Sequence, residues 1–168
     1  MPTTEMIAAT PTDVAPVTAV QLDCASGPDP ASIGAEMHRA FSVLDEFVER
    51  NRLQPNAPAR AIYTAWGPEG VKMTVAIPVV APAAPVPASG AVRLGTLLAT
   101  RTLRFTHRGP YRDLMATYGR ITAYLRAEGL IEDEAGWVRF MPMWEEYLNE
   151  PGTTPEPDLL THIHLPLK

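Results

Sequence analysis

The sequence predicts an α+β fold made of two tandem, pseudo-symmetric strand-helix-strand-strand units with a ligand cleft between them. Two observations carry this prediction: one order of apolar patterns occurs twice, and a Pro-rich stretch separates the two occurrences. One helix can cover only one face of a sheet, so two such units are expected to bury their remaining apolar surface along a shared seam. We therefore expect one domain over residues 1–168, with a first unit at about 1–80, a linker at about 78–90 and a second unit at about 91–168.

The first unit begins with a strand pattern, "APVTAVQLDC", at residues 15–24. In the next segment, residues 31–51, apolar side chains recur at three- and four-residue steps, the spacing of one helix face. These side chains are Ile33, Met37, Phe41, Leu44 and Val48. Two more strands are predicted at residues 59–66 and 71–79, and the "GPEG" between them predicts a hairpin turn.

The second unit repeats this order. A strand, a helix and two further strands are predicted at residues 100–109, 110–129, 137–148 and 159–167. Pro110 suits the first turn of this helix, and Gly129 suits the position just past its end. The intervening "IPVVAPAAPVPASG" has the composition of a semi-rigid, extended linker.

Composition excludes several classes of protein. Hydrophobic residues make up 46% and charged residues 20%, which indicates a globular chain. The net charge of -5 and the missing basic block predict no direct nucleic-acid binding, because phosphate contacts need clustered Lys and Arg. We expect no membrane span and no signal peptide. The single cysteine, Cys24, excludes an intrachain disulfide and favours a cytoplasmic location.

The segment "MPMWEEYLNEP" raises the question of a binding site. In a strand, alternate side chains point to opposite faces. One face then carries Met141, Met143, Glu145 and Tyr147, and we expect it to look into the seam between the units. The other face carries Trp144, which we expect to pack under the second helix together with Val138 and Phe140, while Glu146 is expected to be solvated or helix-facing.

Three segments resemble a known family when taken together. They are "HRGPYRDLMATYGRITAYL", "MWEEYLNEP" and "LLTHIHLPL", at residues 107–125, 143–151 and 159–167. Their order and spacing resemble the gyrase-inhibitor-like (GyrI-like) small-molecule-binding domain, which is related to the effector-binding domains of AraC/MerR-type multidrug-sensing regulators. The resemblance implies two tandem units with both helices on one side and a cleft between them. It also implies a pocket glutamate at Glu145, with Tyr147 two residues on.

Seven residues are candidates for the ligand site. Glu145 in an apolar wall could pair with a cationic ligand or act as a general base, whereas the alternative is a solvated strand-edge carboxylate. Tyr147 could stack on a planar ligand or sit in the core. The remaining candidates are flexible or aromatic side chains expected to line the cleft: Met141, Met143, Trp66, Tyr63 and Tyr111. Since strict alternation separates Trp66 from Tyr63, we expect only one of these two in the cleft, with Trp66 preferred.

We predict no metal site and no cofactor. His162 and His164 share a strand face, and His107 lies in the preceding strand pattern, but no carboxylate or cysteine cluster is near them in sequence. We therefore expect solvated or boundary histidines. Phosphate-binding and nucleophile motifs are also missing from the sequence.

The sequence leaves three functions open. The first is a stand-alone protein that binds hydrophobic aromatic compounds, cationic or neutral, as a drug sink or sensor; the short stretch before the first unit leaves no room for a DNA-binding segment. The second is a hydrolase of cyclopropane-bearing electrophiles, with Glu145 and Tyr147 placing a water. The third is a gyrase-protecting protein with a partner that the sequence does not identify. The shared fold does not choose among them.

Overall fold

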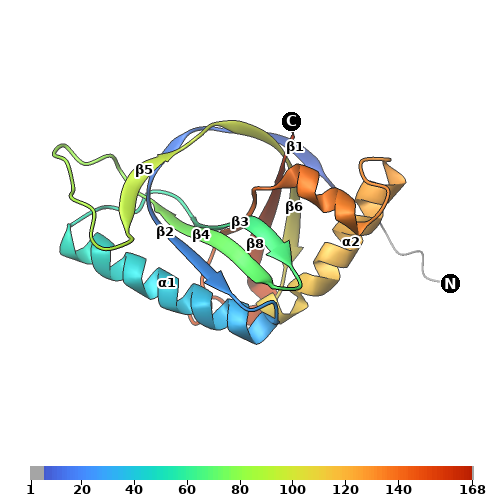
Figure 1. Cartoon of the computed structure of the whole chain (residues 1–168), viewed down its shortest axis with the longest axis horizontal. Helices are drawn as coiled ribbons and strands as arrows, with labels where there is room; N and C mark the ends of the chain where they lie inside the picture. Colours follow the sequence, from blue (N-terminus) through green and yellow to red (C-terminus); the bar gives the residue numbers. More distant parts are fainter. Residues whose placement is uncertain (1–5, 168) are drawn as a thin grey trace.

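The computed structural model describes residues 6–167 and confirms an α+β fold. One antiparallel sheet of eight strands curls into a half-barrel, and two long helices lie against its outer side (Figure 1). The strands are β1 (Thr10–Val14), β2 (Val17–Ser26), β3 (Ala59–Gly67), β4 (Gly70–Pro78), β5 (Arg93–Leu97), β6 (Thr100–Arg108), β7 (Met143–Tyr147) and β8 (Leu160–Pro166). The helices are α1 (Pro30–Arg50) and α2 (Leu114–Ala127), with short 3-10 turns η1 (Tyr111–Asp113), η2 (Glu134–Phe140) and η3 (Glu156–Asp158).

The strand order across the sheet is β1-β6-β8-β7-β3-β4-β2-β5. The two halves of the chain meet in the middle of the sheet, where β3 pairs with β7 and Ala61 lies opposite Glu145. The early strand β1 pairs with β6, and β5 pairs with β2, so each end of the sheet joins segments from both halves. Glu145 therefore sits near the centre of the sheet, on a strand bonded on both sides.

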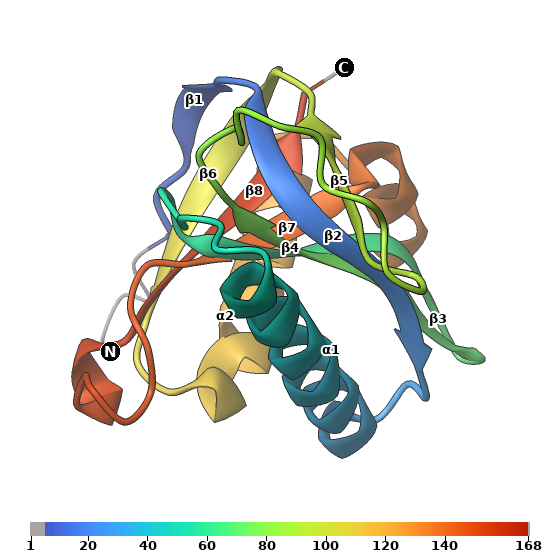
Figure 2. The same ribbon diagram turned by 90° about the vertical axis from the view of Figure 1, so that its left-hand side faces the viewer.

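Helix α1 begins where the sequence supplies its capping groups. The Asp29 side chain accepts a hydrogen bond from the Ser32 backbone N–H (2.9 Å), and Pro30 occupies the first helical position. Helix α1 lies along β2 and β4 (Figure 2). Its buried face packs on these strands in a core cluster whose largest side chains include Leu44 and Phe47. This packing fixes α1 against one half of the sheet.

Helix α2 covers the other half. Its buried residues Ile121 and Leu125 share a second core cluster with Phe105 from β6 and Phe140 from η2. Phe140 thus packs under the second helix, as the sequence predicts. Val138 does not, because the segment before β7 forms a 3-10 turn instead of a strand and leaves this side chain 72% exposed.

The helix-free face of the sheet lines the inside of the curl and is polar. Trp144 lies on this face, not under a helix as predicted from the sequence, and its ring stacks on His164 (centroids 4.8 Å apart). The reason is that the face containing Met143 and Glu145 is itself the helix side of the sheet. Arg60 and Gln21 are also buried on the helix-free face, because the curled strands enclose these side chains.

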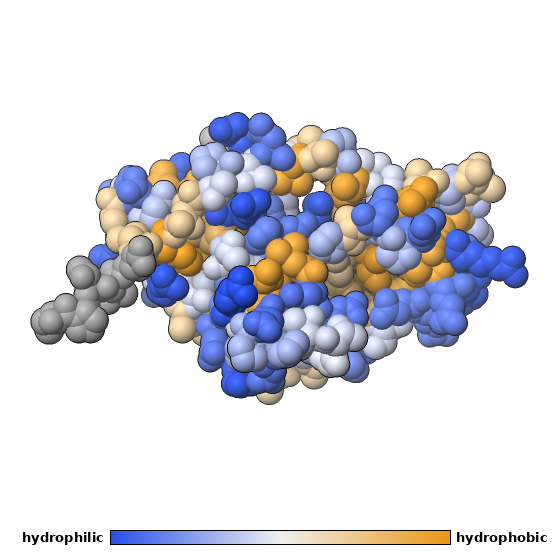
Figure 3. Space-filling view, turned by 180° about the vertical axis from the view of Figure 1, so that it is seen from behind, coloured by the Kyte–Doolittle hydropathy of each residue, from blue (hydrophilic) through white to orange (hydrophobic). Residues whose placement is uncertain are grey.

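The Pro-rich stretch connects β4 to β5 over residues 79–92 and contains only isolated bridges between single residues. Within residues 6–167, neither helix is both long and apolar enough to cross a membrane. The surface seen from behind carries apolar side chains gathered in its middle among hydrophilic ones (Figure 3).

Candidate functional site

A buried carboxylate lies at the centre of the helix side of the sheet. Glu145 is 3% exposed and is placed by β7 between its neighbours Ala61 on β3 and Ile163 on β8. Its side chain points between α1 and α2, because alternation along β7 turns it to the same side as Met143 and Tyr147. The register of β7 is thus consistent with the sequence prediction that Glu145, and not Glu146, shares a face with Met143 and Tyr147.

Three tyrosine hydroxyls donate hydrogen bonds to this carboxylate. Tyr147 and Tyr63 donate to Oε1, at 2.7 and 3.2 Å, and Tyr118 donates to Oε2 at 2.5 Å. The three donors come from β7, β3 and α2, so the carboxylate joins the two halves of the sheet to the second helix. Among the residues that the structure describes, these hydroxyls are the hydrogen-bond partners of Glu145, and no Lys, Arg or His forms an ion pair with it.

The environment perturbs the titration of every member of this cluster. Burial raises the pKa of Glu145 above its usual value, although the three tyrosine hydrogen bonds act in the opposite direction. Burial, followed by the negative charge of Glu145, raises the pKa values of Tyr63, Tyr118 and Tyr147 well above the usual tyrosine value. The hydroxyls therefore stay protonated donors at neutral pH, and the buried carboxylate of Glu145 has no ion-pair partner in the described part of the chain.

Helix α1 and η1 complete the surroundings of Tyr147. The oxygen of Tyr147 lies 3.2 Å from the sulfur of Met37, and its ring meets Phe41 edge to face at 6.2 Å. Tyr111 approaches from the other side, with ring centroids 5.5 Å apart. Tyr147 is thus enclosed by flexible and aromatic side chains, a combination that adapts to planar apolar ligands.

His107 helps to place Tyr111. Its ring nitrogens lie 2.6 Å from the Thr117 hydroxyl and 3.0 Å from the Pro110 carbonyl oxygen, so the ring connects β6, the start of η1 and helix α2. His107 is 4% exposed. The prediction of a solvated or boundary residue is wrong for His107, because both ring nitrogens are used to hold the chain that leads into the second helix.

Two cavities open beside Glu145 on the helix side. The larger has a volume of about 1020 Å³ and is lined by α1, β3, β7 and the start of α2, with Glu145 among its walls. The smaller has a volume of about 730 Å³ and lies between β3, α2 and η2. Both are lined by Trp66, Met115 and Tyr118, so they adjoin at these three side chains. The volumes are in the range that accommodates a drug-sized molecule, roughly 300–1,000 Å³.

Exposed apolar side chains concentrate at these cavities. Seven large hydrophobic residues are exposed in the described part of the chain, and four of them line one cavity or both. These four are Trp66, Tyr111, Met115 and Val138. Exposed apolar groups gathered at a concave surface mark a binding site more strongly than scattered ones do.

The structure places all seven candidate residues in the cavity walls. Glu145, Tyr147, Tyr63 and Tyr111 line the larger cavity, Met141 and Met143 line the smaller one, and Trp66 lines both. The expectation that only one of Tyr63 and Trp66 faces the cleft is wrong. A register shift at Tyr63–Ala65 interrupts the alternation of β3, so the two rings come together at 5.1 Å.

Several wall residues escaped the sequence analysis. Tyr118 lies in the predicted second helix and was not a candidate site residue, yet it gives the shortest hydrogen bond to Glu145. Met37 and Phe41 were expected only as core positions of the first helix and also line the larger cavity. Tyr111 and Tyr118 lie seven residues apart, two helical turns, which is the signal that could have placed both over the same strand.

Comparison with known proteins identifies the family. The model of the GyrI-like small molecule binding domain family matches residues 67–168, more than half of the chain, so this chain belongs to that family. The resemblance stated from the sequence is thereby confirmed. Among curated proteins, none matches the sequence significantly.

Solved structures share the fold at low sequence identity. The EcmrR C-terminal domain superposes with a TM-score of 0.76 at 14% identity, covering 98% of this chain and 99% of that domain. The EcmrR chain in an EcmrR–DNA complex superposes with a TM-score of 0.73 at 13% identity. The match covers 96% of this chain and 57% of the EcmrR chain. SAV2435 bound to tetraphenylphosphonium superposes with a TM-score of 0.60 at 12% identity, covering 96% of this chain and 94% of SAV2435. A hydrolase from Listeria innocua superposes with a TM-score of 0.59 at 12% identity, covering 99% of this chain and 94% of the hydrolase.

Proposed function

We propose that this protein binds lipophilic aromatic cations in the adjoining cavities, with Glu145 as their counter-charge. The observation that supports this most is the buried carboxylate of Glu145, which has three tyrosine donors and no ion-pair partner among residues 6–167. A buried carboxylate without a cation is costly, so a ligand that brings a positive charge recovers electrostatic free energy there. The function fits a drug sink or a sensor.

The aromatic walls favour a diffuse charge over a compact one. Trp66, Tyr63 and Tyr111 present rings to the larger cavity, and ring faces attract cations, by about 2 kcal/mol or more when water is excluded. A delocalised cation with aryl groups would contact these rings and meet Glu145 at the same time. A small hydrated ion such as an ammonium would lose its water shell without filling the space.

A structural neighbour supports the ligand class. SAV2435, which shares the fold, is bound to tetraphenylphosphonium, a cation surrounded by four phenyl rings. The ligand of that protein therefore has the charge and the aromatic surface that the present cavities would accept. It is also a practical probe, because its charge does not change with pH.

The proposal is tested with two ligands of the same shape and opposite charge. Tetraphenylphosphonium and tetraphenylborate are titrated separately into the protein at neutral pH, with tryptophan fluorescence and calorimetry as readouts. We expect saturable binding of the cation, one site per chain, and at least about tenfold weaker binding of the anion, since a repulsive charge at a desolvated site costs well over 1 kcal/mol. Equal affinities would show that hydrophobic contact alone drives binding and would refute the role of Glu145.

We propose hydrolysis as the second function. A carboxylate with a raised pKa inside an apolar wall can accept a proton from water, and neighbouring tyrosine hydroxyls can donate to a developing negative charge. Two structural neighbours from Listeria innocua are described as hydrolases. Incubation with a cyclopropane-bearing electrophile separates the functions: a hydrolase forms many equivalents of ring-opened product, and a binder forms none.

We also propose that the fold is a tandem repeat within a single domain. Each half contains a strand, a helix and two more strands, and the orders β3-β4-β2 and β7-β8-β6 are equivalent about the β3–β7 pair. The cavities lie beside that pair. Superposing β2–α1–β3–β4 on β6–α2–β7–β8 in an experimental structure tests this proposal, which a poor overlap of the paired helices would refute.

A further inference from the structure

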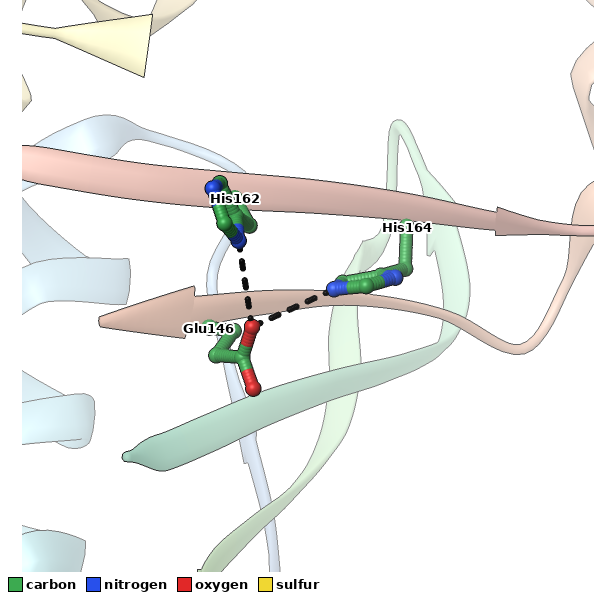
Figure 4. Close-up of side chains that lie close together, drawn as sticks. All are labelled: Glu146, His162 and His164. Carbon is green, nitrogen blue, oxygen red and sulfur yellow. Dashed lines mark hydrogen bonds and ion pairs between the residues drawn. The ribbon is translucent and has the colours of Figure 1, made fainter. Parts of the chain in front are cut away.

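Three side chains with metal-binding chemistry meet on the helix-free face of the sheet, away from the cavities. They are Glu146 from β7 with His162 and His164 from β8 (Figure 4). The register of the sheet brings them together, because Glu146 lies directly opposite His162 and Trp144 lies opposite His164. Spacing along the chain does not indicate this cluster, because the carboxylate and the histidines are sixteen or more residues apart.

The distances in this cluster suit a shared ion. Nδ1 of His162 and Nε2 of His164 each lie 3.3 Å from the same Oε1 of Glu146, and all three ligand atoms lie within 4.8 Å of one another. These separations are longer than ordinary N–H···O hydrogen bonds of about 2.7–3.2 Å. They match the spacing of about 3.3–3.4 Å between two ligands of a tetrahedral ion with bonds of about 2.0–2.1 Å. The two ring nitrogens lie within 4.8 Å of each other and need to come closer to bind one such ion.

The surroundings orient His164 as a ligand. Its Nδ1 lies 2.9 Å from the Thr102 hydroxyl, and its ring stacks on Trp144 with 15° between the planes. When Nδ1–H donates to Thr102, the lone pair of Nε2 is free for a metal, which is how protein metal sites commonly fix the imidazole tautomer. His164 is 4% exposed, so the ring cannot turn away into solvent. The expectation that His162 and His164 are merely solvated or boundary residues is wrong for His164.

Two arginines flank the cluster and narrow the choice of metal. Arg60 lies opposite Glu146 on β3, and Arg104 lies opposite His164 on β6. Their charges oppose Mg²⁺ or Ca²⁺, which rely on several oxygen anions. Metals that bond strongly to imidazole, such as Zn²⁺ or Ni²⁺, tolerate this environment better.

The arginines also provide for an open coordination position. The Nε atoms of Arg60 and Arg104 are buried and have no hydrogen-bond partner in the described part of the chain, and Arg60 is only 6% exposed. Buried donors of this kind need an acceptor. A water, a hydroxide or a small anion bound to the metal would supply one, and three protein ligands leave a position for it.

We propose that Glu146, His162 and His164 bind one divalent transition-metal ion, with zinc as the leading candidate. Thr102 is a positioning residue for His164, and Arg60 and Arg104 lie opposite Glu146 and His164 on the neighbouring strands. The site is independent of the proposed ligand function, because Glu145 and its tyrosines lie on the opposite face of the sheet.

Zinc titration of untagged protein, stripped of metal with a chelator, tests this proposal. We expect calorimetry to show one Zn²⁺ per chain and Trp144 fluorescence to be quenched by Ni²⁺, while Mg²⁺ gives neither signal. Glu146→Gln and His162→Gln should each weaken zinc binding by at least about tenfold, and Thr102→Val should weaken it by about tenfold. Bound zinc should also raise the thermal midpoint of the parent protein and not that of the ligand variants.

Two matched controls make the outcome decisive. His38 is exposed on α1, so His38→Gln should leave zinc binding unchanged, and Glu145→Gln should do the same from the opposite face. His162 is only partly buried, which allows its substitution without loss of the fold, as circular dichroism would verify. The proposal is overturned if zinc in millimolar excess gives no saturable signal, or if His38→Gln weakens binding as much as His162→Gln does.

Discussion

The carboxylates of Glu145 and Glu146, adjacent in sequence, lie on opposite faces of the sheet. Glu145 faces the helices and accepts hydrogen bonds from tyrosines, whereas Glu146 lies 3.3 Å from two histidine nitrogens on the helix-free face. The pKa of Glu145 is raised by burial. Burial also acts on Glu146, but hydrogen bonding to His164 and nearby positive charge bring its pKa below the usual value. The two neighbouring glutamates thus have different contacts and opposite pKa shifts.

Binding of a cation should depend on pH through Glu145. A permanent cation such as tetraphenylphosphonium needs the ionised carboxylate, so its affinity should fall as pH is lowered through the Glu145 pKa, at a higher pH than for an exposed glutamate. Asp45 and Glu150 also line the larger cavity, and Glu145→Gln retains both. The fall in affinity at the raised pKa of Glu145 should be missing from that variant, and any fall that remains there reports Asp45 or Glu150. A parallel fall in both proteins would assign the titration to another group.

Tyr147→Phe should move this pH profile upward. The substitution removes a donor 2.7 Å from Oε1 and with it part of the stabilisation of the charged carboxylate. We expect the midpoint of the pH profile to rise while affinity at alkaline pH changes little. Tyr111→Phe is the matched control, because Tyr111 lines the same cavity but makes no hydrogen bond to Glu145 in the described part of the chain. Identical shifts in the two variants would contradict the hydrogen-bond assignment.

Glu145→Gln should become relatively more stable as pH rises. The folded state raises the pKa of Glu145, so the contribution of this group to stability is full below its unfolded pKa and is lost as pH rises through its folded pKa. Glutamine has no such loss. Urea unfolding at about pH 4 and about pH 8 should therefore show the free energy of unfolding of the variant gaining on the parent at the higher pH. If the variant instead gained stability relative to the parent at the lower pH, the tyrosine hydrogen bonds would lower the pKa of Glu145 more than burial raises it.

Cys24 should be a poor nucleophile in the folded protein. Burial, followed by the charge of Glu36, raises the pKa of its thiol to about 11. At about pH 8 the thiolate fraction is then more than about a hundredfold below that of a free cysteine, whose pKa is near 8.5. Alkylation by iodoacetamide should be correspondingly slow and should accelerate in urea. Equal rates in the folded and unfolded protein would contradict the buried environment.

The sequence alone predicted much of the helix side. Helical spacing located both long helices, and alternation along "MPMWEEYL" placed Glu145 and Tyr147 on one face. These features were predictable because periodicity is a local property of the chain. The structure places Glu145 on the helix side of the sheet, opposite Ala61 of β3. The predicted place of Trp144 was wrong, since a pattern of alternation does not say which face the helix covers.

Other features depend on long-range register and escaped prediction. The bulge in β3 that brings Tyr63 beside Trp66 leaves no clear signal in "ARAIYTAW". The pairing of Glu146 with His162 requires knowledge of how β7 aligns with β8, and a shift of one residue would separate them. Contacts of this kind are fixed by the assembled sheet and not by the spacing of residues along one strand.

The central claim is that Glu145 is the counter-charge of the ligand, and one comparison tests it most directly. Tetraphenylphosphonium is titrated by calorimetry into the parent, Glu145→Gln and Glu146→Gln, all treated with a chelator. The account predicts that Glu145→Gln loses about 1–3 kcal/mol of binding free energy, about 5- to 150-fold in affinity, while Glu146→Gln binds like the parent. If the second function holds, a cyclopropane-bearing electrophile still binds to Glu145→Gln, and its turnover falls by about 10²-fold or more. Equal losses in both variants, or an unchanged affinity and turnover in Glu145→Gln, would contradict the account.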